Sequence, residues 1–141
     1  MKKVLAVALA LIVGLLANAA ICALGVFLWA IAFACYLILG LIPMFAYAAF
    51  LEFLAKTPIV KRAVSPKTFF LCAQTPSVVV ALAHLIINIR KYGSADISRL
   101  FPSLSIIGSP QNDAVIMFVT VVLTTASVFI TAHFQRKEKL T

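Results

Sequence analysis

The fold is decided by an uncharged run of 48 residues, positions 4–51, which is VLAVALALIVGLLANAAICALGVFLWAIAFACYLILGLIPMFAYAAFL. An α-helix rises about 1.5 Å per residue, so this run would measure about 72 Å as one helix. The hydrocarbon core of a bilayer is about 30 Å thick, and about 20 apolar residues cross it. The run therefore holds more than one membrane-spanning element, and the chain must turn within it.

Two further uncharged runs, 68–89 and 114–135, have 22 residues each and fit one span apiece. Of the 141 residues, 64% are apolar and 11% are charged, and the mean hydropathy is +1.12. Soluble domains carry about 45–50% apolar and about 25% charged residues. We expect an all-α membrane protein with a single transmembrane domain over residues 1–141.

The beginning of the chain allows two interpretations. Two lysines, the apolar stretch 4–16 and then Ala17-Asn18-Ala19 are typical of a signal peptide cleaved after Ala19, which would leave three spans. However, cleavage would leave residues 20–51, which are long for one span. We therefore expect an uncleaved four-helix bundle with a tight hairpin within 18–25. The predicted spans are about 4–21, 25–51, 66–89 and 110–135.

The basic residues predict the orientation. Nine lie at the ends and in the loop 55–67, whereas Arg90, Lys91 and Arg99 lie in the loop 90–113. Positive residues stay cytoplasmic, so both termini and the first loop should face the cytoplasm and the second loop should face outward. A multi-pass protein of the cell membrane, most simply a bacterial inner membrane, is the expected localisation. The net charge of +8 then reflects topology and contact with the lipid bilayer, not nucleic acid.

Polar residues recur at helical spacing in the third and fourth spans. One stripe is Gln74, Ser77, Ala81, His84, Asn88 and Lys91, and the other is Asp113, Thr120, Thr124, Ser127 and Thr131. A period near 3.5 places each set on one face of its helix. Because polar faces are costly in lipid, we expect them to meet protein or water as an interhelical polar stripe.

A detailed register follows if the two helices are antiparallel neighbours. Pairing Lys91 with Asp113 brings His84 opposite Thr120, Ser77 opposite Ser127, and Gln74 within one residue of Thr131. His84 could also act as a haem ligand, a proton relay or a pH switch. The other histidine, His133, would lie about 20 Å away along the membrane normal, so the two cannot share a haem within one chain.

The sequence shows no chemistry that indicates an enzyme or a bound cofactor. It has no nucleophile–base pair, no metal-ligand cluster, no glycine-rich phosphate loop and no paired carboxylates. The three cysteines lie in apolar runs without paired spacing, which argues against a disulfide framework. Pro43 and Pro76 lie inside spans, where each removes a helical hydrogen bond and predicts a kink.

Two function classes remain. The first is a non-enzymatic protein that acts through helix–helix interaction with another membrane protein or with itself, such as an accessory or assembly subunit or a toxin-immunity protein. In general shape the chain resembles the small four-span immunity proteins that act against pore-forming bacteriocins, although no motif supports the likeness. The second is a small-solute or ion transporter or channel acting as a homo-oligomer. Polar faces that satisfy each other would favour interaction, and an unmatched polar face would favour transport.

Overall fold

A computed structural model describes residues 1–92 and 110–140 of the chain. In order along the chain, the helices of the described part are α1 (Lys2–Ile31), α2 (Phe33–Leu39), α3 (Leu41–Lys56), α4 (Pro58–Lys61), α5 (Pro66–Tyr92) and α6 (Pro110–Leu140). Four helical stretches are long and apolar enough to cross a membrane: Lys2–Trp29, Ala34–Lys56, Pro66–Lys91 and Val115–Glu138. The predicted all-α fold with four spans is confirmed.

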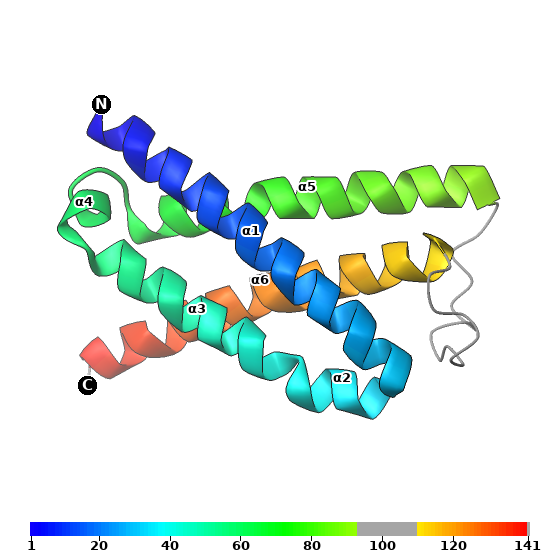
Figure 1. Cartoon of the computed structure of the whole chain (residues 1–141). Helices are drawn as coiled ribbons and strands as arrows, with labels where there is room; N and C mark the ends of the chain where they lie inside the picture. The colour runs from blue at the N-terminus through cyan, green and yellow to red at the C-terminus, as the bar shows by residue number, and fades with distance from the viewer. Residues whose placement is uncertain (93–109, 141) are drawn as a thin grey trace.

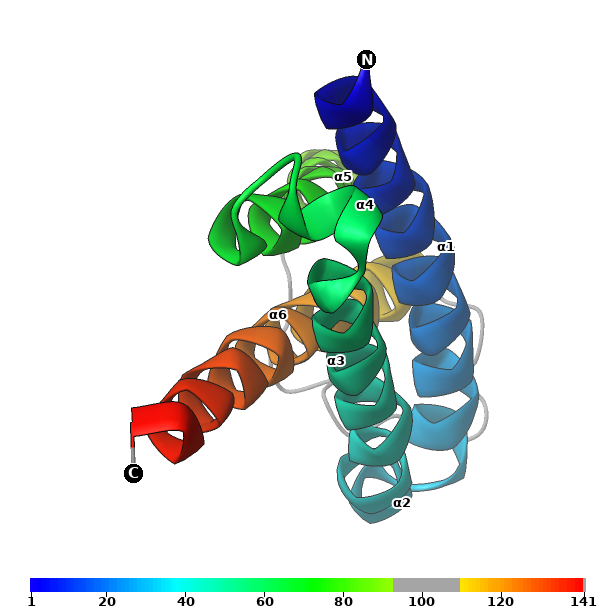
Figure 2. The same ribbon diagram turned by 90° about the vertical axis from the view of Figure 1, so that its left-hand side faces the viewer.

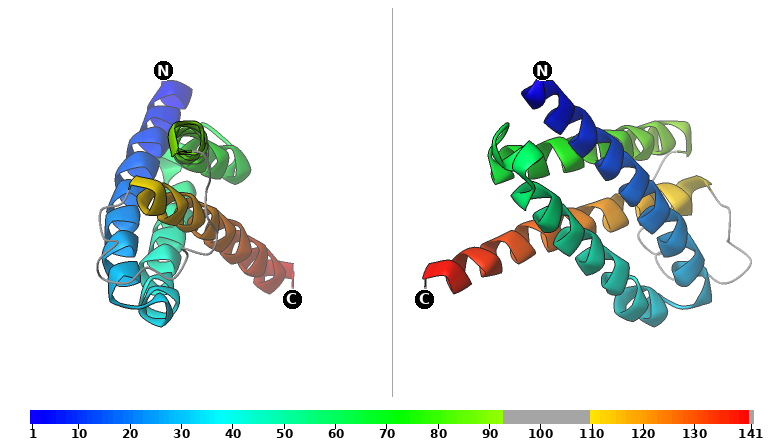
Figure 3. Two further views of the ribbon diagram at one scale, coloured as in Figure 1. Left: turned by 90° about the vertical axis from the view of Figure 1, so that its right-hand side faces the viewer. Right: turned by 60° about the vertical axis from the view of Figure 1, so that its left-hand side comes forward.

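The four spans form two crossed pairs. In Figure 1, α1 and α3 run in opposite directions in front of α5 and α6, and Figure 2 shows the same two layers from the side. Helices α5 and α6 are antiparallel neighbours, as predicted, and α6 diverges from the other helices toward the C-terminus (Figure 3). Both termini and α4 lie at one end of the bundle, which places the N-terminal lysines and the basic residues 56–67 at the same end (Figure 1).

The turn between the first two spans lies later than predicted. The chain reverses at Ala32, which has extended backbone angles of φ −167° and ψ 146°, and α1 continues without a break through 18–25. The predicted hairpin within 18–25 is therefore wrong, and so are the predicted end of the first span at 21 and start of the second at 25. The physical reason is that both residues pack against other helices: Asn18 donates to Gln74 of α5, and Gly25 lies against Thr120 of α6.

The second span is interrupted beside Pro43. Helix α2 ends at Leu39 and α3 begins at Leu41, with Gly40 between them. Pro43 has no N–H to donate to the carbonyl of Leu39, so the helix loses a hydrogen bond at that point. The predicted irregularity at Pro43 is present, whereas α5 continues as one helix through Pro76.

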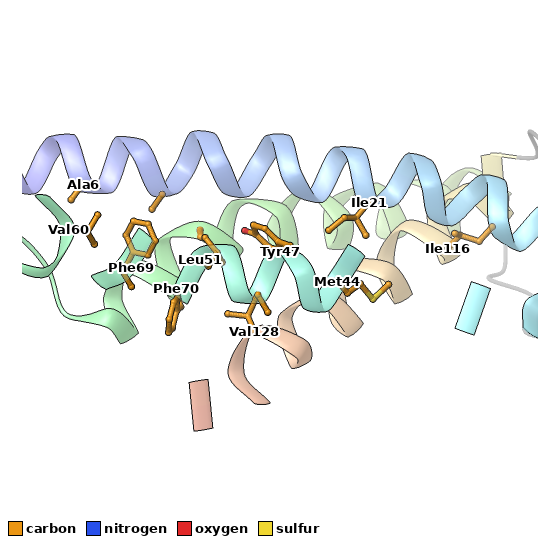
Figure 4. Close-up of a cluster of buried hydrophobic side chains, with 14 of the residues drawn as sticks. Ala6, Ile21, Met44, Tyr47, Leu51, Val60, Phe69, Phe70, Ile116 and Val128 are labelled. Atoms are coloured by element: carbon orange, nitrogen blue, oxygen red, sulfur yellow. The ribbon is translucent and has the colours of Figure 1, made fainter. Parts of the chain in front are cut away.

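Small side chains let α1 approach its neighbours. Ala6, Ala10 and Gly14, spaced four residues apart, are all buried, and a Cβ atom at Gly14 would collide with the backbone carbonyl of Ala73 in α5. Close backbone approach through small residues is the usual way in which membrane helices gain van der Waals contact. Below this crossing, larger apolar side chains such as Leu51 and Phe69 fill the interior (Figure 4).

Candidate functional site

The polar centre of the molecule is Gln74, which hydrogen-bonds to all three of the other spans. Its Oε1 accepts from Asn18 Nδ2 of α1 at 2.9 Å and from Tyr47 Oη of α3 at 3.0 Å. Its Nε2 donates to Thr125 Oγ1 of α6 at 2.9 Å. Gln74 is only 2% exposed, so these bonds form away from water. We refer to Asn18, Tyr47, Gln74 and Thr125 as the Gln74 cluster.

Neighbouring backbone groups orient the members of this cluster. Asn18 uses its second amide hydrogen to bond the carbonyl of Gly14, one turn earlier, at 2.8 Å. Thr125 donates its hydroxyl hydrogen to the carbonyl of Val121 at 2.8 Å, which leaves its oxygen free to accept from Gln74. Because Gln74 directly follows Ala73, the close α1–α5 crossing at Gly14 brings the two amide side chains together. Each donor therefore has a defined acceptor, and the cluster has one consistent orientation.

A second polar contact joins α2, which follows the chain reversal at Ala32, to α6. Tyr36 Oη lies 2.9 Å from Thr120 Oγ1, and Thr120 gives its own hydrogen to the carbonyl of Ile116 at 2.7 Å. Tyr36 is thus the donor between the two hydroxyls. The ring of Tyr36 also meets Trp29 edge-on, with centroids 4.9 Å apart. The Tyr36–Thr120 hydrogen bond therefore holds the chain reversal at Ala32 against the fourth span.

The structure divides the predicted polar stripe. Ala81 and six polar members are buried, the polar members being Gln74, Ser77, Asn88, Thr120, Thr124 and Ser127. Thr131 is half-buried, whereas His84 and Lys91 are exposed. The side chain of Asp113 lies outside what the structure describes, and so does the predicted Lys91–Asp113 pair.

The predicted register between the two stripes is wrong. Thr120 bonds Tyr36 and not His84, and Gln74 bonds Thr125 and not Thr131. Ser127 donates to the carbonyl of Leu123, one turn earlier, and not to Ser77. The prediction failed because it paired two helices only, whereas the polar groups of α5 and α6 also have partners on the first two spans.

His84 makes a local contact within its own helix. Its Nδ1 lies 3.3 Å from Asn88 Nδ2, and Asn88 also donates to the backbone carbonyl of His84 at 2.9 Å. The interhelical hydrogen bond expected for His84 is not formed with Thr120. The histidine thus supports the conformation of Asn88 without belonging to the Gln74 cluster.

Four members of these contacts were missed as site residues: Asn18, Tyr36, Tyr47 and Thr125. Tyr36 and Tyr47 are two of the three tyrosines in the chain, and both lie in the apolar run 4–51. A phenol hydroxyl inside a span requires a partner, which is a usable signal. Asn18 stands four residues beyond Gly14 in the buried series of small residues on α1, and this series could have placed it in the interior.

Two hollows accompany the polar contacts. One, of about 270 Å³, lies between α1, α5 and α6 beside Asn18 and Ser77. The other, of about 230 Å³, lies between the beginning of α5 and the end of α6, where Lys67, His133 and Arg136 surround an apolar base. Among the described residues, no three histidine, cysteine or acidic side chains come together as a metal site.

Comparison with known proteins does not indicate a function for this arrangement of residues. No protein-family model, curated protein or solved structure matches the chain.

Proposed function

We propose that the chain is a non-enzymatic membrane protein that acts through helix–helix interaction with a partner in the bilayer. The observation that carries this proposal is the Gln74 cluster, in which one amide side chain satisfies polar groups from all three other spans. The four side chains of the Gln74 cluster hydrogen-bond directly to one another, without water between them. The interior then serves as a scaffold, and the function belongs to the outer faces.

The charge distribution supports the same proposal. The buried polar side chains of the described residues are all uncharged, and Glu52 lies at the end of α3 in contact with Lys56 at 3.6 Å. Carriers coupled to protons or cations usually contain an ionisable group inside the membrane. The uncharged interior argues against that mechanism.

The outer faces carry the large apolar residues that lipid or a partner helix would cover. Leu16 of α1, Phe50 of α3, Val79 of α5 and Val122 of α6 are each between 45% and 68% exposed. We propose that the partner is another membrane protein, in an accessory, assembly or toxin-immunity role, or a second copy of the chain. The basic end of the bundle would face the cytoplasm of a bacterial inner membrane.

A transport function is the second candidate, and one observation favours it. The 270 Å³ hollow beside Ser77 lies one residue from Pro76, where α5 lacks a hydrogen bond to the carbonyl of Cys72. A solute-sized cavity next to a weakened helix is the arrangement expected of a small-solute carrier. Such a carrier would need a route from the cavity to both membrane surfaces.

Photocrosslinking in native membranes tests the interaction proposal. A photoreactive residue at each of the four exposed positions above reports on one outer face, and one at buried Leu51 is the matched control for Phe50. We expect a discrete adduct with a second chain from at least one exposed position and none from position 51. Purified protein in vesicles should pass no small neutral solute or ion faster than empty vesicles. Protein-dependent flux without any adduct would favour the carrier instead.

A further inference from the structure

The hollow between α1, α5 and α6 lies near the midpoints of α1 and α5, and its rim is exposed on the side of the bundle. Asn18 lies near the midpoint of α1, and Ser77 lies near the midpoint of α5. The buried residues Asn18, Ser77 and Val121 form its inner wall, while Leu15, Ala19 and Val80 at its rim are exposed. A molecule would therefore reach it from the lipid.

Two polar atoms at this hollow have no hydrogen-bond partner among the described residues. They are Asn18 Oδ1 and Ser77 Oγ, on side chains that are only 2% and 5% exposed. Asn18 donates its two amide hydrogens to the carbonyl of Gly14 and to Gln74 Oε1, so its own carbonyl oxygen is the atom without a partner. A polar atom without a partner is costly in hydrocarbon, which makes two at one cavity a notable exception.

Ser77 differs in this respect from several other serine and threonine hydroxyls of α5 and α6. Thr75, Thr124, Thr125 and Ser127 each donate to the carbonyl one turn earlier in their own helix. For Ser77 that carbonyl belongs to Ala73, which lies against Gly14 of α1. The Ser77 hydroxyl remains available to the cavity.

We propose that this cavity binds a small, uncharged, mainly apolar molecule that carries one hydroxyl or N–H donor. The donor would bond Asn18 Oδ1, and Ser77 Oγ would donate to or accept from the same polar atom. Size supports this class, because a cavity of about 150 Å³ holds benzene, and 270 Å³ holds a molecule nearly twice as large. Among the described residues no charged side chain lines the cavity, so a charged ligand would lack a counter-charge there.

Two other occupants would have different consequences. A lipid acyl chain would fill the volume but would leave both polar atoms without partners. A water molecule would bond them but would fill only a small part of a mostly apolar space. A fused aromatic ring with one hydroxyl meets both requirements, so it is the most discriminating probe.

The test compares 1-naphthol with 1-methylnaphthalene, which has the same number of non-hydrogen atoms but no donor. Each is dialysed to equilibrium against the full chain in lipid nanodiscs, with empty nanodiscs of the same lipid as reference. We expect saturable binding of 1-naphthol, about three- to tenfold tighter than that of 1-methylnaphthalene, which is the ratio that one net hydrogen bond provides. Equal affinity, or no saturable binding of either compound, would overturn the proposal.

Three variants locate the binding. Ser77→Ala should reduce the preference for 1-naphthol without loss of thermal stability, since the Ser77 hydroxyl has no partner among the described residues. Ala19→Trp should fill the mouth and abolish binding, whereas Ala20→Trp, on the adjacent exposed position outside the cavity, should leave it unchanged. Binding that survives Ala19→Trp, or an undiminished preference in Ser77→Ala, would place the ligand elsewhere and refute this site. Neither outcome depends on whether the protein has a partner.

Discussion

At the scale of single residues, the packing of the four spans depends on the hydrogen bonds that Gln74 makes to the other three. Gln74 accepts two hydrogen bonds at Oε1, from Asn18 and Tyr47, and donates one from Nε2 to Thr125. These three partners come from three different helices. Hydrogen bonds between membrane helices contribute about 0.6 kcal/mol on average, because the separated helices also find partners in the membrane. Three bonds to one residue therefore add a modest energy but fix the relative rotation of four helices.

Removing the central amide should destabilise the bundle measurably. We expect Gln74→Leu to lower the free energy of unfolding by about 2 kcal/mol, since three hydrogen bonds are lost and their partners stay buried. Thr75→Val is the matched control, because exposed Thr75 bonds only the carbonyl of Leu71 in its own helix. Its effect should stay within about 0.5 kcal/mol. Detergent-induced unfolding measures both, and equal effects would contradict the central role of Gln74.

Glycine at position 14 is required for space and not for backbone freedom. A Cβ atom there meets the backbone of Ala73, which cannot move alone, whereas a Cβ at Gly25 meets the side chain of Thr120 at 3.0 Å. We expect Gly14→Ala to cost about 3 kcal/mol and Gly25→Ala about 1 kcal/mol, within the range found for overpacked interiors. The same unfolding assay orders the two variants, and a larger loss for Gly25→Ala would show that the α1–α5 crossing is not the tighter contact.

At the scale of elements, the first half of α1 contributes side chains to the core of the bundle. Ala6, Ala10, Gly14 and Asn18 of α1 all precede the possible cleavage site after Ala19. Cleavage there would remove the Asn18 donor and most of the α1–α5 contact. We therefore expect the mature chain in membranes to retain this helix. Intact-mass measurement on C-terminally tagged protein checks this, and a chain that begins at Ala20 would contradict it.

The number of spans could be predicted from the sequence, but the first turn could not. Three uncharged runs and the thickness of a bilayer suffice to count four helices. Hydropathy is nearly uniform across residues 4–51, so it does not distinguish a turn at Ala32 from one near Asn18. The role of Asn18 is decided by Gln74, 56 residues away, and local sequence contains no trace of that contact.

The candidate site could be predicted only in part, because local sequence does not show which residues of other helices a side chain contacts. Helical spacing correctly placed Gln74, Thr120 and Ser127 among the buried residues of their helices. It did not identify Thr125, one position beside the predicted stripe, because the crossing of α5 and α6 shifts which residue faces Gln74. Spacing along one helix defines a face, whereas the partners depend on all four helices.

At the scale of the whole molecule, one end of the bundle is strongly basic. The N-terminus, α4 and the C-terminus share that end, together with the contact of Lys56 with Gln135 at 2.9 Å (Figure 1). The positive-inside rule predicts that this end is cytoplasmic. Reporter fusions at Ser65 and after Thr141 should give cytoplasmic signals, and a fusion at Ser98, outside the described residues, an external one. An external signal at Ser65 would reverse the orientation.

The central claim is that the bundle interior around the Gln74 cluster is closed to water from either membrane surface. The most direct measurement is the reaction of a membrane-impermeant thiol reagent with single cysteines at Ala81 and Thr124, which are 1% and 0% exposed, in a chain without Cys22, Cys35 and Cys72. Cysteine at exposed Lys61 is the positive control. A closed interior predicts labelling at position 61 from one side only and none at 81 or 124 from either side. Labelling at 81 or 124 would reveal a water-filled path and contradict the claim.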